Sequence, residues 1–145
     1  MPITKQDFYE GAALNLVART GDIVGIINNS PFYILNGRLA VLLKYSTKGR
    51  SPWGFTVTEN EQSQLQIRSK KMATAIGLIC GSDGVVPITY QAFLSLAGGR
   101  NGPIHVACYR NHGEYYEVSG PDGSLPSKIS PSAWNKILEF KGVPE

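Results

Sequence analysis

Hydrophobic and polar positions follow a helical period at the start of the chain. Thr4 and Asp7 form a Thr-x-x-Asp capping pattern, which predicts a helix from about residue 5 to residue 19. The side chains expected on its buried face are Phe8, Ala12, Ala13, Leu16 and Val17. Glu10 is in line with part of this apolar stripe, although the helix dipole alone also favours an acid in the first turn.

Three short apolar runs then have the length and composition of β-strands, over residues 23–27, 32–35 and 38–45. The Asn36-Gly37 pair between the last two is a strong signal for a two-residue hairpin turn. The third run is apolar on both faces, which predicts a central strand. This run carries Lys44 near its end, so the ammonium group must reach a sheet edge or a cleft.

The rest of the chain alternates further elements with turns. A polar helix is expected from a second capping box, Thr58 to Glu61, to about Lys71. The other expected elements are a loop over 46–54, a strand over 75–80, a turn over 81–84, a short helix over 89–97, a hairpin of 104–110 with 114–120, and a last helix from Pro131 to about Lys141. The prediction is a mixed α/β fold in a single domain over residues 1–145.

Composition limits the class of protein. With 145 residues, 42% hydrophobic and 17% charged, the chain is typical of a globular domain. No apolar run approaches the length of about 20 residues needed to cross a bilayer, and the start lacks the features of a secretion signal, so we expect a cytoplasmic protein without membrane contact. Cys80 and Cys108 do not make a disulfide framework. We expect no zinc site, because His105 and Cys108 would point to opposite faces of one strand.

Charge is more informative than composition. The net charge is only +3, but residues 38–71 hold a local excess of five positive charges. The basic residues of this segment are Arg38, Lys44, Lys48, Arg50, Arg68, Lys70 and Lys71. A phosphate backbone is the natural partner of such an excess, and the alternative is a basic face that only contacts water.

The segment from Thr4 to Cys80 resembles the core of the restriction-endonuclease-like, or PD-(D/E)xK, superfamily. That core is an acid-bearing helix, a three-strand meander, a crossover helix and a further strand. In "PFYILNGRLAVLLK", Pro31 matches the family's proline and Phe32 stands where its first acid belongs. Leu42-Leu43-Lys44 stand at the E-x-K triplet, so Lys44 matches the family's lysine, and Glu10 matches its helix acid. The resemblance implies an α-β-β-β-α-β core over 4–80, with residues 81–145 packed on it as a C-terminal extension of hairpin and helix.

The departures from this pattern affect the expected chemistry. Nucleases of this superfamily use a divalent metal held by carboxylates, and Phe32 and Leu42 cannot supply an oxygen ligand. We therefore expect a scaffold that has lost its metal site and needs no cofactor. Mg²⁺ or Mn²⁺ would bind only if acids from elsewhere rebuild the site around Glu10 and Lys44. The acids considered for this are Asp22, Glu59, Glu61 and Asp83.

The leading hypothesis is a protein that binds DNA or RNA. The candidate contacts are Lys44, Lys48, Arg50, Trp53, Arg68, Lys70 and Lys71, because cations bind phosphates and aromatic rings stack on bases. One alternative is an active Mg²⁺- or Mn²⁺-dependent nuclease with Glu10 and Lys44 as catalytic residues. Another is a small protein-binding inhibitor or accessory factor of a mobile element, which would use Tyr109, Tyr115 and Tyr116.

Overall fold

The computed structural model describes residues 2–20, 22–97 and 99–138, and within them four helices and nine strands confirm the mixed α/β class. The helices are α1 (Lys5–Thr20), α2 (Glu59–Ser69), α3 (Tyr90–Ala97) and α4 (Trp134–Leu138). The strands are β1 (Ile26–Asn29), β2 (Phe32–Leu35), β3 (Leu39–Ser46), β4 (Trp53–Val57), β5 (Ala73–Cys80), β6 (Gly84–Thr89), β7 (Ile104–Tyr109), β8 (Glu117–Gly120) and β9 (Gly123–Ser124).

The first sheet has five strands in the order β1-β2-β3-β5-β6. The three early strands form an antiparallel meander, in which Phe32 is the Cα partner of Leu42. Helix α2 then crosses over, and β5 pairs parallel to β3. As predicted, β3 is a central strand: residues 39–43 are all buried. The three early extended segments are therefore neighbours in one sheet.

The second sheet has four strands in the order β4-β7-β8-β9, so the strands are divided between two sheets. The predicted hairpin is confirmed, because β7 pairs antiparallel with β8. The expected parts 4–80 and 81–145 do not correspond to the two sheets. Strand β4 from the first part pairs with β7, and β6 from the second part pairs with β5.

Three strands were missed by the sequence interpretation, namely β4, β6 and the two-residue β9, and one strand was displaced. Strand β4 begins inside the expected loop, and Trp53, Phe55 and Val57 are its buried positions. Strand β6 follows the expected turn, and its Pro87 lies on an edge strand, where a missing N–H is tolerated. Strand β1 covers 26–29 instead of 23–27, and all four of its residues are exposed.

The two predicted capping boxes are confirmed, and the Asn36-Gly37 turn forms in a longer loop than predicted. In both predicted capping boxes the Thr hydroxyl accepts a hydrogen bond from the backbone three residues on, and the acid accepts one from the Thr backbone. Asn36 and Gly37 both have positive φ, as in a type I′ turn, and the predicted hairpin forms. Leu35 pairs with Leu39, however, so the loop has three residues instead of the predicted two. Helix α4 lies within the predicted last helix, whose end at 139–141 falls outside the described residues. None of the described helices combines the length and apolarity needed to span a membrane.

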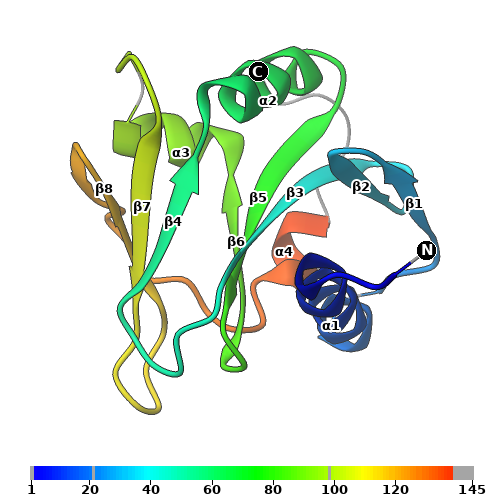
Figure 1. Cartoon of the computed structure of the whole chain (residues 1–145), viewed down its shortest axis with the longest axis horizontal. Coiled ribbons are helices and arrows are strands. Elements are labelled where there is room, and N and C mark those ends of the chain that lie inside the picture. The colour runs from blue at the N-terminus through cyan, green and yellow to red at the C-terminus, as the bar shows by residue number, and fades with distance from the viewer. Residues whose placement is uncertain (1, 21, 98, 139–145) are drawn as a thin grey trace.

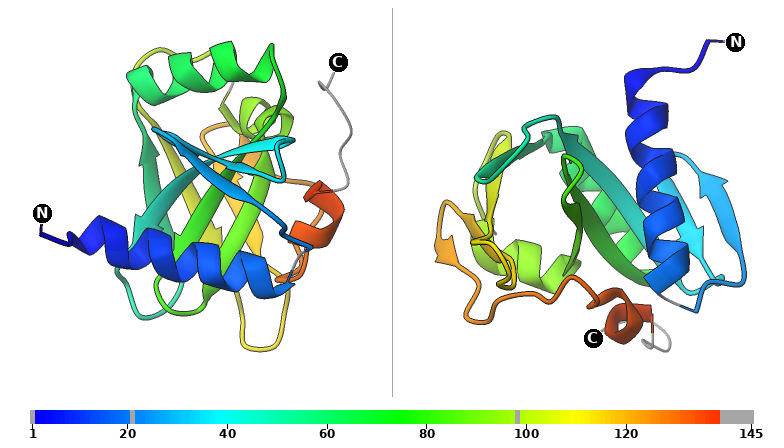
Figure 2. Two further views of the ribbon diagram at one scale, coloured as in Figure 1. Left: turned by 90° about the vertical axis from the view of Figure 1, so that its right-hand side faces the viewer. Right: turned by 90° about the horizontal axis from the view of Figure 1, so that it is seen from below.

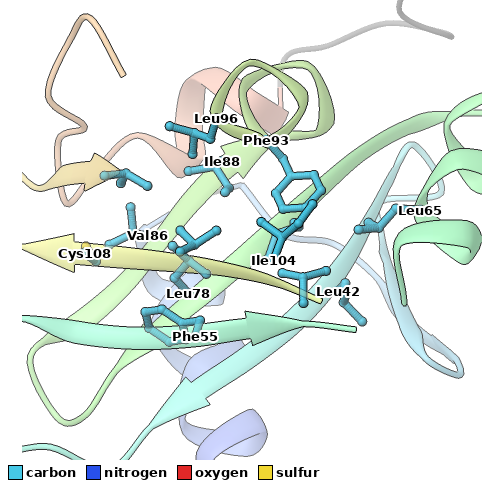
Figure 3. Close-up of a cluster of buried hydrophobic side chains, with 14 of the residues drawn as sticks. Leu42, Phe55, Leu65, Leu78, Val86, Ile88, Phe93, Leu96, Ile104 and Cys108 are labelled. Atoms are coloured by element: carbon cyan, nitrogen blue, oxygen red, sulfur yellow. The ribbon is translucent and has the colours of Figure 1, made fainter. Parts of the chain in front are cut away.

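Two hydrophobic clusters hold these elements together. One lies between the two sheets and includes Leu42, Phe55, Leu78 and Ile104, with Phe93 from α3 (Figure 3). The other lies on the opposite face of the five-stranded sheet, where α1 and α4 pack (Figure 2). Figure 1 shows α2 and α3 at one end of the two sheets and the β3–β4, β5–β6 and β7–β8 connections at the other. Alternate residues of β3 therefore point toward two different environments.

Candidate nucleic-acid interface

Lys44 makes an ion pair with an acid on α2. Its Nζ donates to both carboxylate oxygens of Glu61, each at 2.9 Å, and the two side chains are only 21% and 20% exposed. Glu61 also accepts the backbone N–H of Thr58 in the capping box at 2.9 Å. The lysine therefore neutralises the acid that caps α2, which explains a cation at the end of an apolar strand.

Glu10 lies on the other side of the sheet, bound to a tyrosine of β2. Its carboxylate accepts a hydrogen bond from the Tyr33 hydroxyl at 2.9 Å and another from Gln6 at 2.7 Å. Burial, together with this carboxylate, raises the pKa of Tyr33 to about 12. Glu10 thus fixes α1 against the meander.

The structure does not bring Glu10 and Lys44 together as the catalytic pair. Leu42 of β3 belongs to the cluster between the sheets, whereas Leu43 belongs to the cluster under α1. Since strand side chains alternate, Lys44 shares the face of Leu42 and is separated from Glu10 by the sheet. The acid that does reach Lys44 is Glu61, one of those considered for a displaced site. Across residues 2–20, 22–97 and 99–138, no three His, Cys, Asp or Glu side chains group as metal ligands.

The basic residues of segment 38–71 do not form one patch. Strands β3 and β5 run in register from the Leu39–Ala73 pair to the Ser46–Cys80 pair. Arg38 and Lys71 precede this ladder, and Lys48 follows it. The ladder is about 23 Å long at a rise of ~3.3 Å per residue, so it separates the basic residues at its start from those at its end. We call Lys48 and Arg50 the loop-end pair. The helix-end group is Arg38, Arg68, Lys70 and Lys71.

Within the described part of the chain, neither residue of the loop-end pair makes an ion pair with an acid, and both are exposed. In the helix-end group, Arg68 is already engaged. Its guanidinium lies 5.0 Å from the centre of the Phe32 ring and donates to Asn29 Oδ1 at 3.2 Å. These contacts hold α2 on the meander, so Arg68 is partly a structural residue.

Trp53 is a correction to the predicted contacts, because its side chain is only 2% exposed and cannot stack on a base. It packs between the sheets, and its Nε1 donates to the Lys48 carbonyl oxygen at 3.0 Å. The ring therefore anchors the loop that carries the loop-end pair. A second anchor is the Ser51 hydroxyl, which donates to the Arg110 carbonyl oxygen at 3.1 Å.

A glycine of the β5–β6 turn packs against the same loop. Gly81 has φ +56°, and a Cβ at this position would collide with the Lys48 carbonyl oxygen. Its N–H donates to the Ser46 carbonyl oxygen at 3.0 Å. Only glycine fits this backbone conformation and this close approach without strain. The loop around Lys48 is therefore held by contacts that are distant in sequence.

An aromatic residue that sequence reasoning placed in the core lies beside this loop. Phe8 was expected on the buried face of α1, but it is 66% exposed. The buried stripe of α1 instead follows Ala13 and Val17, with Tyr9 partly buried and stacked on Tyr45 at 4.8 Å between ring centres. Phe8 is one residue away from this stripe, and the stripe's four-residue spacing is the signal that could have identified it.

Phe8 and Lys48 line the same pocket, which has a volume of about 290 Å³. The other lining residues are Tyr9, Ala12, Thr47, Gly49, Gly81 and Ser82. The pocket thus combines an exposed aromatic ring with an ammonium group and two hydroxyl-bearing residues. It draws on α1, the β3–β4 loop and the β5–β6 turn.

The predicted tyrosine surface is reduced to two residues. Tyr109 and Tyr115 are 43% and 55% exposed, but Tyr116 is fully buried. The Tyr116 hydroxyl donates to Asp83 Oδ2 at 2.5 Å, and Arg110 donates to the same oxygen at 2.9 Å. Burial and the hydrogen bond to Asp83 raise the pKa of Tyr116. Tyr116 therefore joins the β5–β6 turn to the second sheet.

Comparisons with known proteins add no relative to this picture. No protein-family model matches the chain, and neither the curated proteins nor the solved structures give a match. The function must therefore be argued from the residues themselves.

Proposed function

We propose that the protein binds single-stranded nucleic acid at the loop end, with Phe8 and the loop-end pair as its main contacts. The observation that carries this proposal is the shared pocket of Phe8 and Lys48, in which the aromatic side chain is 66% exposed. An exposed ring beside an ammonium group matches the chemistry of a nucleotide, with one face for the base and one charge for the phosphate.

Each part of the site has a separate role. Phe8 stacks on one unpaired base, while Lys48 and Arg50 bind the flanking phosphates. Thr47 and Ser82 line the pocket and carry hydroxyl groups suited to a phosphate or sugar. Because Trp53 and Gly81 fix the loop around Lys48, this loop loses little conformational entropy when the nucleic acid binds.

A single strand is favoured over a duplex because the pocket carries an exposed aromatic ring. Bases in a duplex are already stacked on their neighbours, so only an unpaired base is free to cover Phe8. Phosphate contacts and stacking do not distinguish DNA from RNA, and the proposal covers both. By its sequence pattern, segment 4–80 resembles a nuclease core without its usual carboxylates, and we propose binding without cleavage, with no cofactor and in the cytoplasm.

The test compares two double variants that remove the same charge from opposite ends of the sheet. Fluorescence anisotropy with a labelled single strand is measured over a range of salt for the wild type, Lys48→Ala/Arg50→Ala and Lys70→Ala/Lys71→Ala. Two lost phosphate contacts should make the fall of log K with log salt less steep by about 1.4. Near 50 mM salt this corresponds to a loss of about 60-fold in affinity.

The control variant should bind nearly as tightly as the wild type at equal ionic strength. Equal losses in both variants would indicate attraction by net charge alone and would contradict a built site. The same preparations incubated with Mg²⁺ or Mn²⁺ test the nuclease alternative, and cleavage lost in Glu10→Gln would favour it. The geometry speaks against that alternative, because Glu10 and Lys44 face opposite sides of the sheet.

A protein-binding role has weaker support. Tyr109 and Tyr115 remain exposed near the β7–β8 connection, and tyrosines are common in protein interfaces. However, Tyr109 already donates to Asn111 Oδ1 at 2.6 Å, and the third predicted tyrosine is buried. We therefore place nucleic-acid binding first.

A further inference from the structure

We propose that the protein forms a symmetric dimer through strand β1, which joins two five-stranded sheets into one continuous sheet. Strand β1 is an edge strand, and Figure 1 shows no described helix or strand on its outer side. This inference is independent of the proposed nucleic-acid site, which is formed by α1, the β3–β4 loop and the β5–β6 turn.

The edge lacks the features that usually prevent strand pairing. Natural edge strands are protected by charged residues, prolines or bulges. Residues 23–37 contain no charged residue, and β1 itself contains no proline. Three apolar side chains are exposed here: Val24 at 91%, Ile27 at 61% and Ile26 at 40%. As far as residues 2–20, 22–97 and 99–138 show, a lone monomer would expose both this apolar surface and the outer backbone groups of β1.

The outward-facing backbone groups of β1 belong to Ile26 and Asn28. The Asn36 N–H donates to the Gly25 carbonyl oxygen at 2.9 Å, so Gly25 points inward to β2. In an antiparallel ladder the inward residues alternate with outward ones. Ile27 therefore also points inward with its backbone, and the N–H and C=O groups of Ile26 and Asn28 face solvent.

These groups are self-complementary, which is why we assign the surface to a second copy of the chain. A twofold axis at Ile27 pairs Ile26 of one chain with Asn28 of the other, and the same pairing repeats in the opposite sense. Both pairs form two backbone hydrogen bonds each. The two Ile27 residues then face each other as a non-hydrogen-bonded pair, in which Cα atoms approach to about 4.5 Å and side chains pack closely.

The absence of charged residues from the edge segment 23–37 itself also favours a second copy. Any charged residue on the edge would meet its own copy across the twofold axis, and like charges opposite one another are destabilising. The interface is small, because it consists of four backbone hydrogen bonds and the side chains of Ile26 and Ile27 from each chain. The association should therefore depend on protein concentration.

The test starts with sedimentation velocity of the full chain up to about 1 mM, the weak end of specific association. We expect the mass to double with concentration. Asn28→Pro removes an outward N–H from an edge position that tolerates proline, so it should leave a folded monomer by circular dichroism. Ile27→Lys should also give a monomer, while Leu94→Lys, a matched change at a 42% exposed position of α3, should still dimerise.

Disulfide trapping tests the register itself. The native cysteines are buried, so an added thiol is the accessible one. Under mild oxidation, Ile27→Cys should form a covalent dimer, because its two copies meet at the axis. Asn29→Cys should not, since its copies are displaced by about 13 Å along the strands at ~3.3 Å per residue. The proposal would be overturned by a monomer at every concentration, or by disulfide trapping at position 29 instead of 27. It would also be overturned if the β1 edge paired only with a strand of a different protein.

Discussion

Both ends of the five-stranded sheet carry basic side chains, but the two ends differ in what surrounds these side chains. At the loop end, Lys48 shares a pocket with the exposed ring of Phe8, and its loop is anchored by Trp53. At the helix end, Arg68 lies over the Phe32 ring and bonds to Asn29. A basic side chain thus lines a ligand-sized pocket at one end, whereas a basic side chain at the other end holds α2 on the meander.

This difference shows that a basic segment in a sequence is not a basic surface. The crossover of α2 separates residues that are close in sequence, because it returns the chain to the start of the parallel ladder. Helix α1 brings in the aromatic ring from about 40 residues earlier in the chain.

The largest effect is expected from Gly81→Ala. The methyl group would collide with the Lys48 carbonyl oxygen at a backbone φ of +56°, so the loop must move. We expect a loss of about 3 kcal/mol in the free energy of unfolding, measured by chemical denaturation. Nucleic-acid affinity should also fall, because the loop-end pair is displaced.

The control for this change is Gly113→Ala. Gly113 also has positive φ, at +79°, but no atom lies within 4 Å of an added Cβ. This variant should lose only about 1 kcal/mol, the cost of the backbone conformation alone. Equal losses for the two glycines would mean that the contact with Lys48 is unimportant.

Removing the ring tests the stacking role at the loop end. Phe8→Ala should weaken single-strand binding by about 1–3 kcal/mol, because stacking on one base is lost. The exposed side chain contributes little to folding, so stability should hardly change. Ile3→Ala removes a similarly exposed apolar side chain, 68% exposed, outside the pocket and should leave affinity intact. Restored binding in Phe8→Trp would sharpen the assignment.

The ion pair between β3 and α2 tests whether Lys44 is structural. Glu61→Gln keeps a capping acceptor for Thr58 but removes the charge that faces Lys44. A double-mutant cycle with Lys44→Met should give a coupling of about 1 kcal/mol in the free energy of unfolding. Additive losses would show that the pair contributes nothing, and a loss of nucleic-acid affinity in Lys44→Met would return Lys44 to the binding site.

The smallest effect concerns alkaline pH and the contact that holds α1. The pKa of Tyr33 is about 12 in the folded protein, against an ordinary value of 10.0. Above pH 10.0 the unfolded chain loses this proton first, so the stabilisation is complete below that pH and lost as pH rises through the folded value. Tyr33→Phe should flatten this decline in denaturation curves, although Tyr116 contributes to it as well. An unchanged slope would contradict the effect.

Much of the fold follows from local rules. The capping boxes at Thr4 and Thr58 and the Asn36-Gly37 hairpin form, the latter with a loop one residue longer than predicted, because each is decided by residues a few positions apart. Strand β4 was hidden because its alternation of buried and exposed positions begins directly after a Gly- and Pro-containing loop. Strand β6 was hidden because Pro87 argues against a strand unless it lies at a sheet edge.

The candidate site was harder to predict than the fold. Sequence alone identified Lys48 and Arg50, but it assigned the stacking role to Trp53 and placed Phe8 in the core. With exposures of 2% and 66%, Trp53 is excluded as a stacking residue and Phe8 becomes the candidate for that role. The pocket draws on three segments that meet only through tertiary packing, so no local pattern could reveal it.

The most direct measurement is photo-crosslinking of the protein to a single strand that carries 5-iodouracil, followed by peptide mapping. We expect crosslinks at Phe8 or Tyr9, or in the loop around Lys48, and their loss in Lys48→Ala/Arg50→Ala. Crosslinks confined to residues 68–72, or crosslinks that persist undiminished in that variant, would contradict the assignment of nucleic-acid binding to the loop end.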